Sequence, residues 1–145
     1  MSNDSIILSN YKKAISSLEK ALNTYERRRQ ASDYSPDEEN LNKSGVIQNF
    51  EFTYELGWKL IRRWLNVNVS TDISENIMKR ELFRIAKGNK LINDDRVWFT
   101  FHQLRNNSSH NYDEIISDDV FSESANLLTE SKALLENIHT LKGDL

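Results

Sequence analysis

The chain has 145 residues, of which 38% are hydrophobic and 28% are charged, and its formal net charge is −3. This length favours a single domain over residues 1–145, while four glycines and one proline are too few for a β-sandwich or barrel. The absence of cysteine excludes disulfides, thiolate zinc sites and cysteine nucleophiles.

The first predicted helix covers roughly residues 4–30. Tyr11, Ala14, Leu18 and Tyr25 follow one another at helical spacing and form one apolar stripe. The second helix is expected from Pro36 to about Leu65, because Ser35 can cap it and Pro36 suits its first position, with Glu38 completing a capping box. Gly57 lies in its middle, which indicates close approach of a neighbouring helix.

Three further helices are predicted in the second half of the chain. The third is expected from Asp72 or Ser74 to Lys87, with Gly88 as its C-terminal cap. The fourth begins after Asn93 or Asp94, and we expect the polar residues 105–113 to end it, since Asn and Ser are weak in helix interiors. The last covers about residues 117–141.

Five helices with short connections predict an all-α up-and-down bundle of four to five helices. Its core is expected to draw on seven aromatic residues, namely Tyr11, Phe50, Tyr54, Trp58, Trp64, Trp98 and Phe101. So many aromatic side chains in the second to fourth helices suggest that some lie in a subunit interface, and we therefore expect a dimer.

Charge and hydropathy restrict the partners. No apolar run is long enough to cross a membrane, and the N-terminus lacks the basic start of a signal peptide, so we expect a cytoplasmic protein with no membrane partner. Residues 51–105 carry ten basic and seven acidic side chains, whereas residues 106–145 carry two and eight. The middle of the chain can therefore present a basic surface, although solvated helix faces explain the same charges.

The histidines His102, His110 and His139 share no metal-binding spacing, and we expect neither a metal nor a cofactor. His102 is interpreted as a surface or interface side chain, and His139 as a complement to a helix dipole.

The polar residues around His110 are the best candidates for chemistry. Arg105 and His110 are five residues apart, so they diverge on an unbroken helix and converge only if the helix ends between them. A converged pair could cleave RNA without metal, with His moving a proton and Arg holding charge on the phosphorane. In the alternative interpretation, Arg105 forms a salt bridge with Asp113 or Glu114 and His110 caps a turn.

The spacing Arg105-x4-His110-x-Tyr112 resembles the R-x4-6-H signature of HEPN domains, in the form found in toxins paired with minimal nucleotidyltransferases. The segment FEFTYELGWK at residues 50–59 and the residues flanking the motif also resemble this family. The resemblance covers about residues 5–142, which is nearly the whole chain.

The resemblance implies a dimeric bundle in which the motifs of two subunits face one cleft. It implies a metal-independent ribonuclease toxin with Arg105 and His110 as the catalytic pair and Asn106 as a supporting residue. It also implies a cognate minimal nucleotidyltransferase as antitoxin, which transfers AMP to Tyr112. The added phosphates would place charge and bulk where RNA binds.

Two other interpretations remain open. Some members of the family are described as substrate-binding subunits of a two-chain nucleotidyltransferase, in which case Arg105 and His110 would bind phosphate without cleaving it. The third is a helical interaction module without nucleotide chemistry, which internal salt bridges at the motif would favour.

Overall fold

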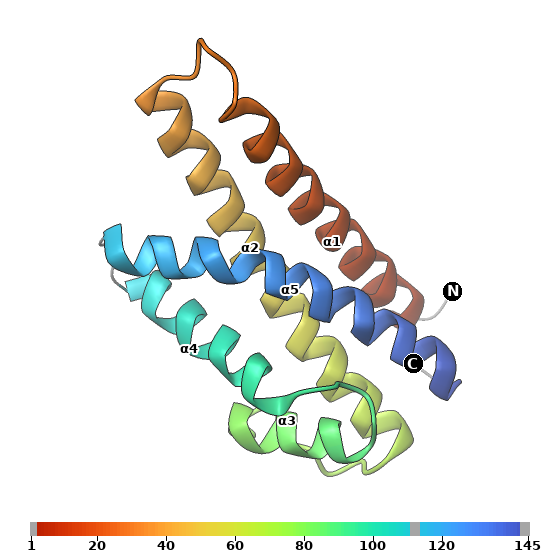
Figure 1. The fold of residues 1–145 in the computed structure, drawn as a ribbon. Coiled ribbons are helices and arrows are strands. Elements are labelled where there is room, and N and C mark those ends of the chain that lie inside the picture. Colours follow the sequence, from red (N-terminus) through yellow and green to blue (C-terminus); the bar gives the residue numbers. More distant parts are fainter. Residues whose placement is uncertain (1–2, 111–113, 143–145) are drawn as a thin grey trace.

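The computed structural model describes the backbone of residues 3–110 and 114–142, and the side chains of residues 6–106 and 118–142. These residues form five helices and no strand (Figure 1). The helices are α1 (Asn3–Arg28), α2 (Pro36–Asn68), α3 (Lys79–Gly88), α4 (Asp95–His110) and α5 (Glu114–Leu141). The predicted all-α helical bundle is confirmed, whereas the dimer stays a prediction.

The first two helices, α1 and α2, form an antiparallel pair. Figure 1 shows α1 and α2 running side by side, with α5 crossing them and the short α3 at the lower end of the molecule. α5 contacts α1, α2 and α4, and α4 also packs on α2 and α3. This arrangement brings α4 against the middle of α2. None of the described helices is both long enough and apolar enough to cross a membrane.

Local capping explains where α2 and α4 begin. Ser35 accepts a hydrogen bond from the Glu38 backbone N–H at 3.1 Å, as the sequence predicts. The Glu38 carboxylate accepts a hydrogen bond from Arg28 Nε at 2.6 Å, and this contact links the end of α1 to the start of α2. The Glu38 side chain therefore pairs with Arg28 and does not form the predicted capping box. Asp94 accepts from the Arg96 N–H at 2.9 Å and caps α4.

Two predictions about α3 are wrong. The helix begins at Lys79, several residues after the expected start, because the preceding residues fold into turns in which Ser70 and Ser74 side chains accept backbone N–H groups. Gly88 is the last helical residue, and the left-handed backbone conformation after the helix is at Lys90, with φ 63°.

The core is built around α2 and contains buried side chains from all five helices. Its largest fully buried side chains are aromatic: Trp98, Tyr11, Tyr54, Phe50, Phe83 and Phe101. Trp58, expected in the core, is only partly buried at its edge. The predicted close approach at Gly57 is confirmed, since an added Cβ would lie 3.2 Å from the Trp98 ring and 3.2 Å from the Tyr11 hydroxyl.

Candidate functional site

The fourth helix positions Arg105 directly after the aromatic stripe of the core. Trp98, Phe101 and Arg105 follow one another at spacings of three and four, so they share the face of α4 that packs on α2. The guanidinium therefore lies at the edge of the core, and the Arg105 side chain is 25% exposed.

α4 ends within the polar residues 105–113, as predicted, but it does not end between Arg105 and His110. The helix continues to His110. Extending a helix that is already formed costs little compared with nucleating one, so Asn and Ser can be accommodated in its last turns. Arg105 and His110 thus belong to one helix, and five residues correspond to about 7.5 Å along its axis and about 140° around it.

Two carboxylates from α2 flank Arg105. Its Nη1 lies 3.3 Å from Glu51 Oε2, and its Nε lies 3.5 Å from Glu55 Oε1. Glu51 and Glu55 are four residues apart and therefore share one face of α2. Glu55 Oε2 also accepts a hydrogen bond from Trp58 Nε1 at 3.1 Å. These contacts orient the guanidinium from the α2 side.

A series of hydrogen bonds lies beside these ion pairs and links Tyr54 of α2 through His102 to Asn106, the residue after Arg105. The Tyr54 hydroxyl and His102 Nδ1 are 2.9 Å apart, and Asn106 Nδ2 lies 3.2 Å from His102 Nε2. With Asn106 donating to Nε2, the neutral ring carries its proton on Nδ1 and donates to the Tyr54 oxygen. Asn106, which was predicted as a supporting residue, is therefore positioned through His102 by the buried Tyr54.

Burial lowers the pKa of His102, and the positive charge of Lys79 lowers it further, while Glu55 acts in the opposite direction. The ring therefore stays neutral at neutral pH, which preserves the hydrogen bonds to Tyr54 and Asn106. Burial raises the pKa of Tyr54, so its hydroxyl also stays protonated.

Four members of this site were not predicted from the sequence. Glu51 and Glu55 were not named as site residues, Tyr54 was assigned to the core, and His102 was interpreted as a surface or interface residue. His102 is instead partly buried and hydrogen-bonded. One feature of the sequence could have identified the two carboxylates as neighbours of the core. Glu51 and Glu55 directly follow Phe50 and Tyr54, which lie on the apolar stripe of the second helix.

Two predicted site residues lie partly or wholly outside the described structure. His110 has a described helical backbone, but its side chain is not among those described, and Tyr112 lies outside the described residues. The alternative pairing of Arg105 with Asp113 or Glu114 likewise involves side chains outside the described part. The structure therefore places Arg105 and Asn106 together with Glu51, Glu55 and His102.

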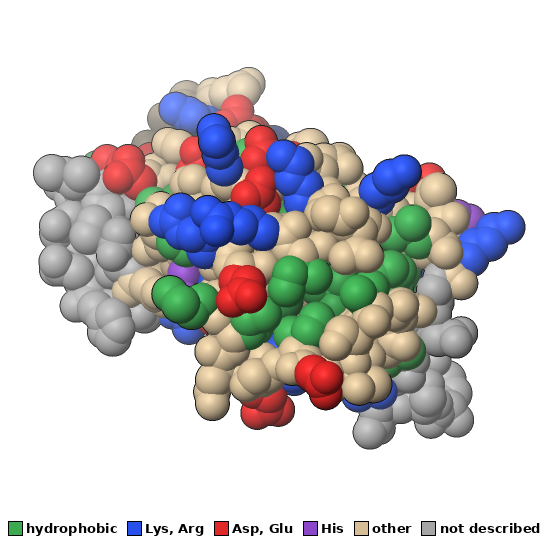
Figure 2. Space-filling view, turned by 90° about the horizontal axis from the view of Figure 1, so that it is seen from below, with side chains coloured by type: hydrophobic (Ala, Val, Ile, Leu, Met, Phe, Trp, Pro, Cys, Tyr) green, Lys and Arg blue, Asp and Glu red, His purple; other side chains and the backbone are tan. Residues whose placement is uncertain are grey.

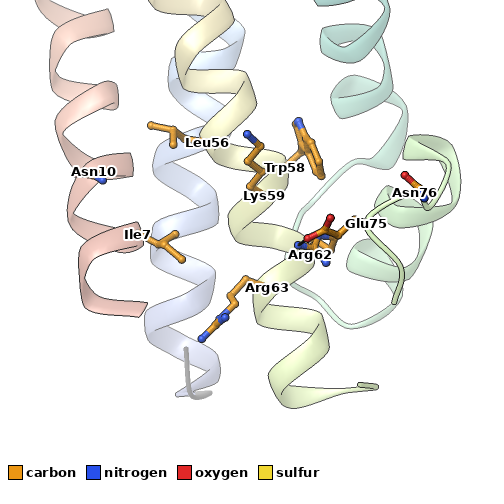
Figure 3. Close-up of a pocket in the computed structure, with 9 residues that line it drawn as sticks. All are labelled: Ile7, Asn10, Leu56, Trp58, Lys59, Arg62, Arg63, Glu75 and Asn76. Carbon is orange, nitrogen blue, oxygen red and sulfur yellow. Dashed lines mark ion pairs between the residues drawn. The ribbon is translucent and has the colours of Figure 1, made fainter. Parts of the chain in front are cut away.

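A basic hollow of about 550 Å³ lies nearby, between α1, α2 and the turns before α3 (Figure 3). Lys59, Arg62 and Arg63 project from α2 toward it, and Arg62 forms an ion pair with Glu75 at 3.5 Å. Trp58 lines the same hollow, and Lys79 Nζ lies 3.8 Å from the centroid of its ring. Among the described side chains, no group of three or more His, Asp or Glu residues is arranged to hold a metal.

The helical bundle agrees with the family comparison. Residues 7–140 match the family described as nucleotidyltransferase substrate binding protein like, and the chain belongs to this family.

Similar proteins have been described in two bacteria. A Haemophilus influenzae protein named "Probable ribonuclease HepT" is 34% identical over 96 residues, which is 66% of this chain and 66% of that protein. A solved structure from the same organism, described as the fold of a substrate binding domain of a nucleotidyltransferase, is 28% identical with a TM-score of 0.80 and covers 91% of this chain and 98% of its own. A crystal structure from Thermus thermophilus, 24% identical with a TM-score of 0.59, covers 83% of this chain and 98% of its own and shows the fold alone.

Proposed function

We propose that this chain is a HEPN-type ribonuclease that cleaves RNA without a metal ion, as the toxin of a toxin–antitoxin pair. The ion pairs of Arg105 with Glu51 and Glu55 are the contacts that the interaction-module interpretation expects, but a quarter of the Arg105 side chain remains exposed, and this accessible position is the observation that carries the proposal. The name of the Haemophilus relative supports the same activity.

In this mechanism His110 accepts the proton of a ribose 2′-hydroxyl, and the oxygen then attacks the adjacent phosphorus. The bond to the 5′-oxygen of the next nucleotide breaks, that oxygen takes up a proton from water, and His110 returns its proton to the solvent. Arg105 stabilises the negative charge that develops on the phosphorane, and Asn106 helps to orient the phosphate.

The proposed active form is a homodimer in which the two motifs face one cleft. Arg105 and His110 lie about 140° apart around a single helix, so one chain does not bring their backbone positions onto one face. Phe52 supports an interface, because this aromatic side chain on α2 is 60% exposed.

The decisive experiment incubates the purified, unmodified chain with tRNA and bulk cellular RNA in EDTA. Cleavage by the parent is expected, with a loss of at least about 100-fold in His110→Ala, because proton transfer contributes this much in general acid–base catalysis. His139→Ala, which removes an exposed histidine near the end of α5, serves as the matched control and should cleave like the parent. Equal cleavage by His110→Ala would remove His110 from the mechanism.

A second candidate is a non-catalytic subunit that binds substrate for a partner nucleotidyltransferase. The family description and the solved Haemophilus structure favour it, as does the basic hollow, where Lys59, Arg62 and Arg63 surround space next to an indole ring. An unmodified parent chain that leaves RNA intact would support this candidate over the ribonuclease.

The proposed partner is a minimal nucleotidyltransferase that transfers AMP to Tyr112. We expect Tyr112→Phe to retain cleavage activity, because the phenol is not needed for the proton transfer, and to escape neutralisation by the partner. The measurement is the mass of the intact chain after incubation with the partner and ATP, where each AMP added to the parent gives a discrete increase. An unchanged mass increase in Tyr112→Phe would place the modification on another residue.

A further inference from the structure

A groove between α3 and α4 begins beside the motif and is separate from the basic hollow on α2. One part, of about 490 Å³, is lined by Lys79, Arg80, Phe99, His102 and Asn106 among others. A second part, of about 290 Å³, is lined by Arg84 and Arg96 and again by Arg80 and Phe99. The two parts are adjacent, because Arg80 and Phe99 line both, and together they are here named the α3–α4 groove.

The groove carries an excess of positive charge. Arg80, Arg84 and Arg96 are exposed, and within the described part of the chain none of them has a carboxylate within ion-pair distance. The acidic residue in the groove, Asp95, pairs with Lys87 at 3.5 Å. Figure 2, which views the α3 end of the molecule, shows Lys and Arg side chains beside a hydrophobic strip, with Asp and Glu side chains among them. Uncompensated arginines side by side suit a ligand with repeated phosphates.

The centre of the groove also offers a flat surface. The Arg80 guanidinium lies 4.2 Å from the centroid of the Phe99 ring, and the His102 ring is 5.9 Å from the same ring. Unpaired bases stack on aromatic rings and on guanidinium planes, whereas bases within a duplex are already stacked on their neighbours. The combination of arginines and a stacking surface therefore favours a single strand.

The groove has the length and direction to guide a strand to the motif. Arg96 and Asn106 are ten residues apart on α4, which corresponds to about 15 Å of helix. This distance equals about four phosphates at the 3.4 Å spacing of a stacked strand. Asn106 lies at the motif end of the groove, directly after Arg105 in the chain.

We propose that the α3–α4 groove binds a single-stranded RNA segment next to the phosphate that is cleaved. Arg80, Arg84 and Arg96 contact successive phosphates, and the surface formed by Arg80 and Phe99 stacks one base. The identity of the strand as RNA rests on the proposed ribonuclease function, whereas the binding surface itself rests on the groove.

The test measures binding of the parent chain to a fluorescent single strand of about ten nucleotides with 2′-O-methyl ribose, which has no 2′-hydroxyl to attack the phosphate. We expect Arg80→Gln/Arg84→Gln to raise the dissociation constant about tenfold or more. We also expect the slope of log affinity against log salt to fall by about 1.4, because each phosphate contact to a single strand contributes about 0.7. Phe99→Leu keeps an apolar side chain and should weaken single-strand binding about tenfold, with less effect on a duplex.

The matched control is Lys20→Gln/Arg27→Gln, which removes two exposed charges from α1, away from the groove. This variant has the same net charge as Arg80→Gln/Arg84→Gln and should bind like the parent. Equal weakening in both variants, or parent affinity and slope in Arg80→Gln/Arg84→Gln, would overturn the groove proposal.

Cleavage of the unmodified RNA of the same sequence separates this proposal from the proposed function. Cleavage by Arg80→Gln/Arg84→Gln with an unchanged KM overturns the groove and leaves the ribonuclease in place. Binding that depends on Arg80 and Arg84, without cleavage by the parent, supports the groove and rejects the ribonuclease.

Discussion

Mixing the Arg105→Gln and His110→Ala variants is expected to restore RNA cleavage that neither variant has by itself. In a composite site, Arg105 and His110 come from different subunits. A mixed dimer then contains one site with both residues intact and one site with neither. Random exchange makes about half of the dimers mixed, with one of two sites intact, so about a quarter of the parent activity should return.

The control for this experiment is the double variant Arg105→Gln/His110→Ala. Mixed with either single variant, it leaves no composite site with both residues, and the mixture should stay inactive. Native mass spectrometry shows whether mixed dimers have formed. Mixed dimers without restored activity would contradict a site shared between subunits.

Gln is the appropriate replacement for Arg105 because of the carboxylates around it. Glu51 and Glu55 are 21% and 33% exposed in their side chains, and removing the guanidinium leaves two negative charges near each other at the edge of the core. A Gln side chain can still donate a hydrogen bond to one of them. The variant should therefore lose the charge needed for catalysis while the contact between α2 and α4 is retained.

Gly57→Leu is expected to lower the free energy of unfolding by about 3 kcal/mol, at the upper end of the usual cost of overpacking. A Cβ at this position would already lie 3.2 Å from the Trp98 ring. Trp98 and Tyr11 are fully buried and cannot move toward solvent without opening the core. Urea unfolding followed by circular dichroism measures the change.

Gly45→Leu is the matched control, since it makes the same substitution in the same helix. No atom lies within 4 Å of a Cβ built at Gly45. Replacing glycine inside a helix should therefore raise stability, by up to about 1 kcal/mol. Similar destabilisation of both variants would contradict the close contact of α2 and α4 at Gly57.

The Gly57 contact also bears on the site. It fixes the distance between α2 and α4 at Trp98, two turns before Arg105. Glu51 and Glu55 lie on α2 within two turns of Gly57, so a displacement of α4 there would change the ion pairs of Arg105. A smaller residue than Leu at position 57 that leaves the protein folded should accordingly reduce RNA cleavage by more than the loss of folded protein explains.

The number of helices and most of the core follow from the sequence by itself. Apolar residues at spacings of three and four predict α1, α2, α4 and α5, since these spacings place side chains on one face of a helix. Ser35 and Asp94 mark two helix starts, because a cap requires only a side chain and the backbone a few residues away. Gly57 indicated a close contact, although the sequence did not name Trp98 as the neighbour.

The tertiary structure alone decided the partners of the motif. Glu51 and Glu55 are about fifty residues from Arg105, and only the packing of α2 on α4 brings their carboxylates to its guanidinium. His102 looked like a surface residue until Tyr54 from α2 was placed next to it. Local propensity predicted that α4 would end within residues 105–113, and it ends there at His110, because an existing helix extends at low cost into Asn and Ser residues. Contacts within one helix depend on nearby residues, whereas contacts between helices depend on the whole bundle, which is why the sequence predicted the former and missed the latter.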